Sequence, residues 1–256
     1  MSEPSFDFTG RTALVTGAAS GIGLHTARWL EAHGIAELVL VDMDGATLER
    51  EEWTCENRCF AGDVADPALW DRIGAELHQI DHAVLNAGIA GCGKTIAETS
   101  FAEWRRTVAT NQDGVFLGLH TVMPLMARGR GGSVVITASV AAVRTVSTID
   151  YGASKAAVAH MAGIAAREGG PQGIRVNAIA PGGVDTAIWD KTPVFRRQVE
   201  RFGSREAAIR EFGKVGSPLG RFATADEIAG QIGFLLSDMA ATITGVVLVS
   251  DGGFTL

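Results

Sequence analysis

The sequence predicts an α/β fold in which helices cover both faces of a doubly wound parallel sheet. Short apolar runs rich in β-branched residues alternate with helical patterns along all 256 residues, as expected of strands buried on both faces. The chain is 46% apolar, which is enough for one sizeable core. Its 32 glycines follow no fixed period and indicate many tight turns between strands and helices. No linker, repeat or low-complexity segment divides the chain, so we expect a single domain over residues 1–256.

Charge and cysteine content argue against several classes of function. The formal net charge is −7 and there is no basic run, so neither nucleic acid nor an anionic membrane surface is an expected partner. No apolar run approaches the roughly 18 residues that a membrane span needs. The three cysteines lack the spacing of a zinc site and suggest reduced thiols, so we expect a cytoplasmic protein without a bound metal.

The first strand, expected at residues 12–16, leads into a glycine-rich turn and a helix that runs to about residue 33. Gly17, Gly21 and Gly23 stand at the junction in the order G-x-x-x-G-x-G. This arrangement places backbone N–H groups and a helix N-terminus against a phosphate, as in Rossmann-like dinucleotide-binding folds. A plain turn would explain any one of these glycines, but three at one strand-to-helix junction favour a cofactor site.

The second strand, expected at residues 38–41, ends in Asp42. An acidic residue about 20 positions beyond the glycine turn accepts hydrogen bonds from the ribose hydroxyls of the adenosine. Its carboxylate would repel the additional phosphate of NADP. No Arg or Lys stands at residues 18–20 or at position 43 to neutralise that phosphate. The sequence therefore favours NAD.

The remaining elements alternate in the same way. Asp66 and Pro67 suit an N-cap and a first helical turn, and Thr224 is an N-cap followed by acidic residues. We expect strands at residues 58–62, 83–85, 132–137, 173–180 and 246–249. We expect helices at residues 44–52, from 67, at 101–126, at 151–167 and from 224, while residues 188–218 are the least regular long stretch. The helix from residue 151 is expected to bury Ala157, Met161 and Ile164.

Tyr151 and Lys155 are the strongest candidates for chemistry. They are four residues apart, about one turn of the expected helix, so they share a face. A nearby ammonium lowers a phenol pKa from about 10 toward neutrality, which makes the tyrosine a usable acid or base. Ser139, which follows the strand at residues 132–137, could donate a hydrogen bond to a carbonyl oxygen. Such a pair is often only structural, but Tyr151 is the only tyrosine in the chain.

Taken together, these residues resemble the short-chain dehydrogenase/reductase family over nearly the whole chain. The turn TGAASGIG at residues 16–23 looks like the coenzyme motif, and residues 86–88 are similar to an Asn-Asn-Ala-Gly segment with Leu85 in place of the first asparagine. The resemblance implies a catalytic tetrad of Asn111, Ser139, Tyr151 and Lys155. The cofactor-binding residues that it implies are Gly17, Ser20, Gly21, Ile22, Gly23, Asp42, Asp63, Val64, Asn86, Ala87, Gly88, Tyr151, Lys155, Pro181, Gly182, Val184 and Thr186.

The resemblance also implies how these residues work. Tyr151 would act as a base toward an alcohol and as an acid toward a ketone, while Ser139 orients the substrate oxygen. Lys155 would lower the phenol pKa and bind the nicotinamide ribose, and Asn111 would hold a water that links Lys155 to solvent. Relatives are commonly tetramers, so we expect a homotetramer.

Three functions remain open at this point. The leading hypothesis is an NAD-dependent secondary-alcohol dehydrogenase or ketone reductase. The alternative is a 3-oxoacyl thioester reductase or 3-hydroxyacyl dehydrogenase of the same family. Such enzymes usually prefer NADPH and dock a carrier on a basic face, which Asp42 and the net charge disfavour, although Arg128 and Arg130 could form a small basic patch. A silent NAD-binding module is disfavoured because it need not keep the four catalytic residues.

Residues 89–96, 140–150 and 188–218 are expected to reach the substrate beyond the carboxyl ends of the strands. The first two segments are mostly small or apolar, with Lys94 and Arg144 as their only cations. In the third, Phe195, Val199 and Phe202 fall on one face of a helix. We expect a mobile lid at residues 188–218 that lays this face over a hydrophobic cyclic or aryl alcohol, in preference to a sugar or a carboxylate-bearing substrate. The alternative is a lid helix that packs on its own core.

Overall fold

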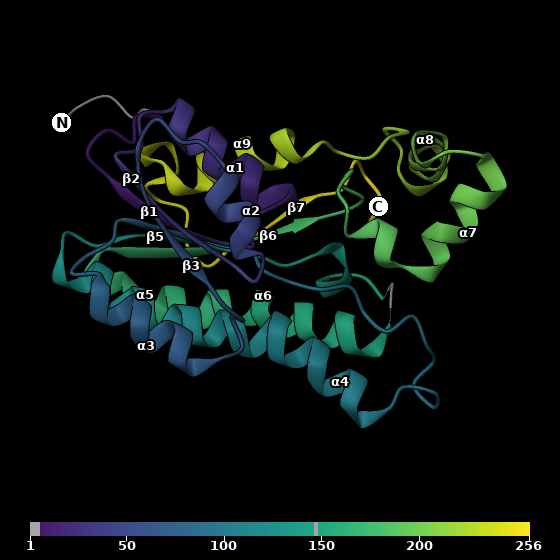
Figure 1. Cartoon of the computed structure of the whole chain (residues 1–256), viewed down its shortest axis with the longest axis horizontal. Helices are drawn as coiled ribbons and strands as arrows, with labels where there is room; N and C mark the ends of the chain where they lie inside the picture. The colour runs from purple at the N-terminus through teal and green to yellow at the C-terminus, as the bar shows by residue number, and fades with distance from the viewer. Residues whose placement is uncertain (1–5, 146–147) are drawn as a thin grey trace.

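Seven parallel strands form one sheet between two layers of helices (Figure 1). The structure is a computed structural model and describes residues 6–145 and 148–256. All neighbouring strands run parallel in the order β3-β2-β1-β4-β5-β6-β7, which confirms the predicted doubly wound sheet. The strands are β1 (Thr12–Thr16), β2 (Glu37–Asp42), β3 (Glu56–Ala61), β4 (His82–Leu85), β5 (Gly132–Thr137), β6 (Ile174–Pro181) and β7 (Val247–Ser250).

The helices divide into two layers and one projection (Figure 1). One layer consists of α1 (Gly21–Ala32), α2 (Gly45–Arg50) and α9 (Ala225–Leu236). The other consists of α3 (Pro67–Glu76), α4 (Phe101–Val108), α5 (Gly114–Arg128) and α6 (Ile149–Gly169). The projection consists of α7 (Pro193–Phe202) and α8 (Arg205–Gly216), which lie beyond the carboxyl ends of the strands.

Each face of the sheet has its own hydrophobic core. Leu14 of β1 is buried in the cluster that includes Trp70 and Val158, whereas its neighbour Val15 is buried in the cluster that includes Leu30 and Ile232. Successive side chains of a strand point to opposite faces. The central strands therefore need apolar residues at consecutive positions, which is why they read as continuous apolar runs rather than as an alternating pattern.

Helix α6 begins at Ile149, two residues before the expected start, and buries a different stripe from the one expected. Ala157 and Met161 are half-buried, but Ile164 is 50% exposed, so its predicted burial is wrong. The inward-facing Lys155 fixes the rotation of the helix, and Ile164 lies one residue off the resulting stripe. The buried stripe is Ser154, Val158, Ala162 and Ala165.

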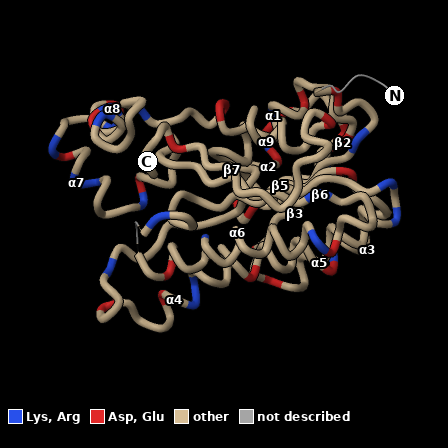
Figure 2. Tube along the Cα trace, turned by 180° about the vertical axis from the view of Figure 1, so that it is seen from behind, with Lys and Arg blue, Asp and Glu red and all other residues tan. Residues whose placement is uncertain are grey.

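Residues 188–218, expected to be irregular, contain two well-capped helices. The Thr192 side chain accepts a hydrogen bond from the N–H of Phe195 at the start of α7. Ser204 caps α8 in the same way, and Gly203 between the helices has a φ of +81° that favours glycine. Figure 2 shows several cationic positions on α7.

Candidate active site

The glycine turn after β1 has the backbone geometry that only glycine tolerates. Gly17 and Gly21 have φ values of +67° and +54°, and a Cβ on Gly23 would overlap the carbonyl oxygen of Gly17. Ser20 is the N-cap of α1 but forms no side-chain capping hydrogen bond. The turn can therefore present N–H groups and the N-terminus of α1, where Ile22 lies in the first turn, to a phosphate. This geometry fits the pyrophosphate of a dinucleotide.

Asp42 at the end of β2 is hydrogen-bonded to this turn. Its carboxylate accepts hydrogen bonds from the N–H of Ala19 and from the N–H of Asp44, both at 3.0 Å. It is half-buried, so it remains partly open to solvent beside the glycine turn. The expected site for the adenosine ribose therefore lies next to the expected phosphate site.

Asp63 and Val64, expected near the adenine, follow β3 at the same edge of the sheet. Asp63 accepts the N–H of Ala65 at 2.9 Å and is exposed. Val64 is buried instead, and a Cβ on Gly114 would lie 2.7 Å from its Cγ2. The side chain of Val64 thus packs on α5.

Asn86 joins the carboxyl ends of three strands. Its Nδ2 donates to the Thr16 carbonyl of β1 at 3.1 Å, and its Oδ1 accepts from the Thr137 hydroxyl of β5 at 3.2 Å. The N–H groups of Asn86 and Ala87 both donate to Thr16 Oγ1, at 2.9 and 3.0 Å. Leu85, at the position of the missing asparagine, is buried in the core. The loop that starts at Asn86 therefore leaves the sheet in a fixed direction.

Lys155 is buried at the centre of the candidate site. Its Nζ donates to the Thr137 carbonyl at 2.7 Å and lies 5.8 Å from the centroid of the Tyr151 ring. Burial lowers the pKa of Lys155 to about 8. A Cβ on Gly88 would lie 3.4 Å from this Nζ, so the loop after β4 passes directly over the lysine. The structure thus brings Tyr151, Lys155 and Gly88 together.

The pKa of Tyr151 is shifted in the opposite direction from that expected. Burial raises the pKa of the phenol, and a hydrogen bond with the Ser139 side chain acts in the lowering direction. The Lys155 Nζ donates to the Thr137 carbonyl and lies 5.8 Å from the centroid of the Tyr151 ring, and the pKa of the phenol remains above its ordinary value. In the protein alone, the phenol is therefore held protonated, with Ser139 beside it.

Asn111 is a polar residue in the interior of a long helical region, and its contacts explain why it is there. Residues Ala109–Asp113 form a π-helical turn between α4 and α5, and Asn111 is fully buried there. Its Oδ1 accepts the N–H of Ile89 at 2.8 Å, and its Nδ2 donates to the Ile89 carbonyl at 3.0 Å. Nδ2 also lies 3.3 Å from the Ser154 hydroxyl. Asn111 therefore holds the loop that passes over Lys155.

The segment after β6 closes the site from the other side. Pro181 ends β6, and a Cβ on Gly182 would lie 2.9 Å from the Cα of Asp251. Val184 is buried, whereas Thr186 reaches the glycine turn, because a Cβ on Gly21 would lie 3.4 Å from its Cγ2. Residues from five strand ends thus surround the expected cofactor position.

Helices α7 and α8, the expected lid, have an aromatic core of their own. Phe195 is 0% exposed, and its ring centroid lies 6.1 Å from Trp189 and 6.3 Å from Phe212. Phe222 lies 5.3 Å from Trp189 in the same cluster. The expectation that Phe195 faces the substrate is therefore wrong, because its ring faces the inside of the lid. Residues 146 and 147 of the second expected substrate segment lie outside the described residues.

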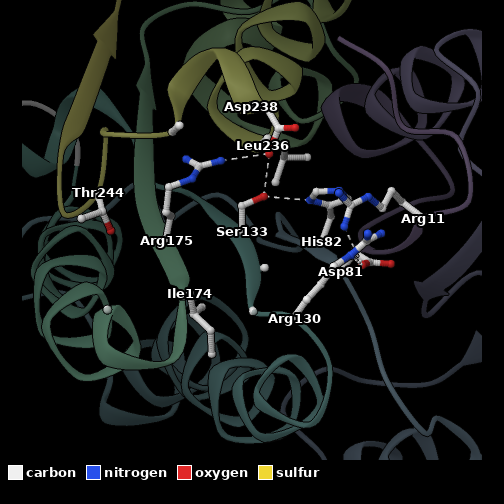
Figure 3. A pocket seen from close by; sticks show the side chains of 15 residues that line it. Arg11, Asp81, His82, Arg130, Ser133, Ile174, Arg175, Leu236, Asp238 and Thr244 are labelled. Atoms are coloured by element: carbon white, nitrogen blue, oxygen red, sulfur yellow. Dashed lines mark hydrogen bonds and ion pairs between the residues drawn. The ribbon is translucent and has the colours of Figure 1, made fainter. Parts of the chain in front are cut away.

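A pocket of about 410 Å³ lies far from these residues, at the amino ends of the strands (Figure 3). Arg175 donates to the carbonyls of Leu236 and Ser237, both at 3.0 Å, at the end of α9. Ser133 donates to the Leu236 carbonyl at 2.8 Å and pairs with His82 Nδ1 at 2.8 Å. These groups bind one another and the backbone, so we interpret the pocket as a structural clamp on α9.

Within residues 6–145 and 148–256, no group of three or more His, Cys, Asp or Glu could hold a metal ion. Over the same residues, no helix is both long and apolar enough to cross a membrane.

Comparisons with known proteins agree with this geometry. A family model described as enoyl-(acyl carrier protein) reductase matches residues 17–255. The cis-4-hydroxycyclohexanecarboxylate dehydrogenase of Sinomonas cyclohexanicum is 37% identical over 97% of this chain and 98% of its own. The levodione reductase of Leifsonia aquatica is 37% identical over 98% and 97%. The crystal structure of a short-chain type dehydrogenase/reductase from Mycobacterium marinum is 30% identical, with a TM-score of 0.83 over 98% and 97% of the two chains.

Proposed function

The chain belongs to the short-chain dehydrogenase/reductase family of oxidoreductases, and from that premise we propose that it interconverts a secondary alcohol and a ketone with NAD(H). The proposed substrate is a hydrophobic cyclic or aryl compound. One observation carries the proposal: Ser139, Tyr151 and Lys155 lie close together beside the glycine turn, at the carboxyl ends of the strands.

Tyr151 is the proposed acid and base. Its raised pKa keeps the phenol protonated in the protein alone, which is the form that gives a proton to the ketone oxygen in reduction. In oxidation the same oxygen takes the hydroxyl proton of the alcohol. Ser139, hydrogen-bonded to Tyr151, stabilises the substrate oxygen as negative charge develops on it. When bound, the nicotinamide accepts or donates the hydride.

Lys155 and Asn111 are proposed to support this proton transfer. The Lys155 ammonium supplies positive charge 5.8 Å from the Tyr151 ring and is placed to hold the nicotinamide ribose. Asn111 fixes Ile89 and so holds the loop above Lys155. The proposed water link from Lys155 to solvent would start beside Asn111, because a Cβ on Gly88 would touch both Asn111 Oδ1 and Lys155 Nζ.

Asp42 is the reason to propose NAD rather than NADP. Its half-buried carboxylate lies beside the glycine turn, where it would accept hydrogen bonds from the ribose and repel an additional phosphate. The sequence places no Arg or Lys at residues 18–20 or at position 43. We therefore expect kcat/KM to be at least about tenfold higher with NAD, which corresponds to about 1.4 kcal/mol.

Two observations support a cyclic substrate. The relatives include a dehydrogenase named for cis-4-hydroxycyclohexanecarboxylate, a ring alcohol that also carries a carboxylate, and a reductase named for levodione, so they support the ring of the proposed substrate and not its lack of a carboxylate. The segments that we assign to the substrate side, residues 89–96 and 140–150, are mostly small or apolar in sequence. We propose that the lid at residues 188–218 closes over the bound substrate.

A panel of alcohols and ketones with both cofactors tests the proposal. Cyclohexanol, methyl-substituted cyclohexanols and 1-phenylethanol should be oxidised with NAD, and polyols and hydroxy acids should be poor substrates. Equal efficiency with NAD and NADP would contradict the assignment of the cofactor. A clear preference for polyols or hydroxy acids would contradict the assignment of the substrate.

A thioester reductase of the same family remains the second candidate, because the matching family model is described as an enoyl-(acyl carrier protein) reductase. The basic patch that such an enzyme would need is weak here, since Arg130 lies 3.5 Å from Asp81 at the amino ends of the strands, away from Tyr151. Acetoacetyl thioesters in the same panel distinguish the two functions. We further propose a cytoplasmic homotetramer, which size-exclusion chromatography with light scattering tests for its subunit number.

A further inference from the structure

A buried carboxylate lies beside Tyr151 and has no part in the chemistry proposed above. Asp150 immediately precedes Tyr151 in the first turn of α6 and is 0% exposed. Its Oδ2 accepts hydrogen bonds from the N–H of Cys92 at 2.9 Å and from the hydroxyl of Thr107 at 2.8 Å. One side chain therefore joins the start of α6, the loop after β4 and helix α4.

Asp150 keeps its charge despite being buried. Burial raises its pKa, but the nearby Thr148 side chain and the hydrogen bonds from the Cys92 N–H and the Thr107 hydroxyl outweigh this effect, so the pKa lies below its ordinary value. A buried charge that depends on such donors is strongly destabilised when the donors move away. The carboxylate therefore favours one position of the loop.

The loop itself approaches Asp150 more closely than any residue with a side chain would allow. A Cβ on Gly91 would lie 2.7 Å from Asp150 Oδ1 and 2.9 Å from the Cβ of Tyr151. The backbone of the loop thus packs on the helical turn that carries the phenol. At the other end of the loop, Asn111 binds both the N–H and the carbonyl of Ile89. Residues 89–92 are fastened at both ends, by Asn111 and by Asp150.

We propose that Asp150 is a positioning residue, which fixes residues 89–92 as one wall of the substrate site at a constant separation from Tyr151. The inference rests on the proposed function, since that function assigns this loop to the substrate side. Without the anchor, the substrate oxygen is held less well against the phenol, so substrate binding and turnover both weaken. The cofactor contacts at the glycine turn and Asp42 do not depend on this anchor.

Steady-state kinetics and cofactor titration of three variants test the proposal. Asp150→Ala should raise the KM for a cyclic alcohol by at least about fivefold and lower kcat/KM by at least about tenfold, while the Kd for NADH stays within about twofold. Asp150→Asn keeps an oxygen for the Cys92 N–H and the Thr107 hydroxyl, so it should restore most of the lost kcat/KM. Ser133→Ala is the matched control, because it removes a buried hydrogen bond at the opposite ends of the strands.

Hydrogen–deuterium exchange adds a readout that needs no turnover. The peptide that contains Cys92 should exchange faster in Asp150→Ala than in the wild type or in Ser133→Ala. If the wild type oxidises no cyclic alcohol, the proposed function fails, and exchange alone still decides whether Asp150 is the anchor. Unchanged exchange at Cys92, an alcohol KM within about twofold of wild type, or a parallel loss of NADH affinity overturns the proposal.

Thr107→Val provides a second variant if Asp150→Ala does not fold. The substitution keeps the shape of the side chain and removes one donor to the carboxylate. It should raise the alcohol KM by at least about twofold and leave the Kd for NADH unchanged. An unchanged KM in this variant also overturns the proposal.

Discussion

At the scale of single residues, the proposed reaction depends on one hydroxyl group. Tyr151→Phe removes that hydroxyl and leaves the ring, so kcat should fall by about 10²–10⁴-fold, the usual contribution of a general acid or base. NADH binding should be nearly unchanged, because the phenol acts on the substrate oxygen. Stopped-flow turnover and fluorescence titration with NADH measure the two effects separately. Loss of NADH binding with the fold intact would show that the division of roles is wrong.

The buried Lys155 should lower the free energy of unfolding of the protein. Burial lowers its pKa to about 8 from the ordinary 10.5, so below pH 8 the folded protein holds a buried ammonium that the unfolded chain keeps in water. Between pH 8 and 10.5 the unfolded state binds more protons than the folded state, and the free energy of unfolding therefore rises with pH across this window.

We accordingly expect Lys155→Met to abolish turnover yet stabilise the protein. The free energy of unfolding at pH 7, measured in urea without nicotinamide cofactor, should rise by about 1–3 kcal/mol, since the unpaired Thr137 carbonyl offsets part of the gain. The rise between pH 8 and 10.5 should disappear in the variant. A less stable variant, or one that keeps this rise, would show that the ammonium is well compensated by its surroundings.

At the scale of elements, the lid depends on the burial of one ring. Phe195→Ala removes a fully buried side chain from the aromatic cluster of α7 and α8, a change that usually costs about 3–5 kcal/mol when the site cannot collapse. We expect faster cleavage of residues 188–218 in limited proteolysis. Val194→Ala is the control, because that side chain is 53% exposed on the same helix. Equal cleavage of both variants would mean that the aromatic cluster does not hold the lid together.

The sequence predicted most elements because local pattern and tertiary burial agree in them. Strand β1 was expected at residues 12–16 and lies at Thr12–Thr16, and Thr224 forms the expected N-cap of α9. The helical face of Phe195, Val199 and Phe202 was expected and lies on α7, but α8 was not expected. The starts of both helices are marked only by Thr192 and Ser204, and their apolar residues face a cluster built from distant parts of the chain. No sequence pattern indicated that Asp150 is buried and binds the loop after β4, since a carboxylate in the first turn of a helix is ordinary at the surface.

The candidate site shows a similar limit. The spacing of Tyr151 and Lys155 was enough to place them together, and the glycine pattern predicted the turn at residues 17–23. The direction of the Tyr151 pKa shift could not be read from spacing, because it depends on how deeply the fold buries the phenol. The hydrogen bond between Asn111 and Ile89 likewise depends on the π-helical turn, which no sequence pattern predicted.

At the scale of the whole molecule, His82 makes the fold sensitive to acid. Burial lowers its pKa to about 3 from the ordinary 6.5, so between these values the unfolded chain binds a proton that the folded protein does not. The free energy of unfolding should therefore fall as the pH decreases from 6.5 toward 3, by about 1.4 kcal/mol per pH unit through this residue.

His82→Asn isolates this contribution, because an amide can still pair with the Ser133 hydroxyl but does not titrate. The variant should be less stable than wild type at pH 7, and the difference should shrink by about 1.4 kcal/mol for each pH unit below 6.5. Urea unfolding at pH 7, 6, 5 and 4.5 measures both curves. Parallel curves would show that the pKa of His82 is the same in the folded and the unfolded state.

The attachment of Asp42 to the glycine turn constrains how a descendant of this enzyme could change its cofactor. The carboxylate accepts the N–H groups of Ala19 and Asp44, so it supports the turn in addition to its proposed role of binding the ribose. Replacing it with a small or basic residue, the direct route to accepting NADP, would leave both backbone donors without their partner. An evolutionary or engineered route to NADP must therefore rebuild residues 18–20 before it alters Asp42, and the order of the mutations matters as much as their identity.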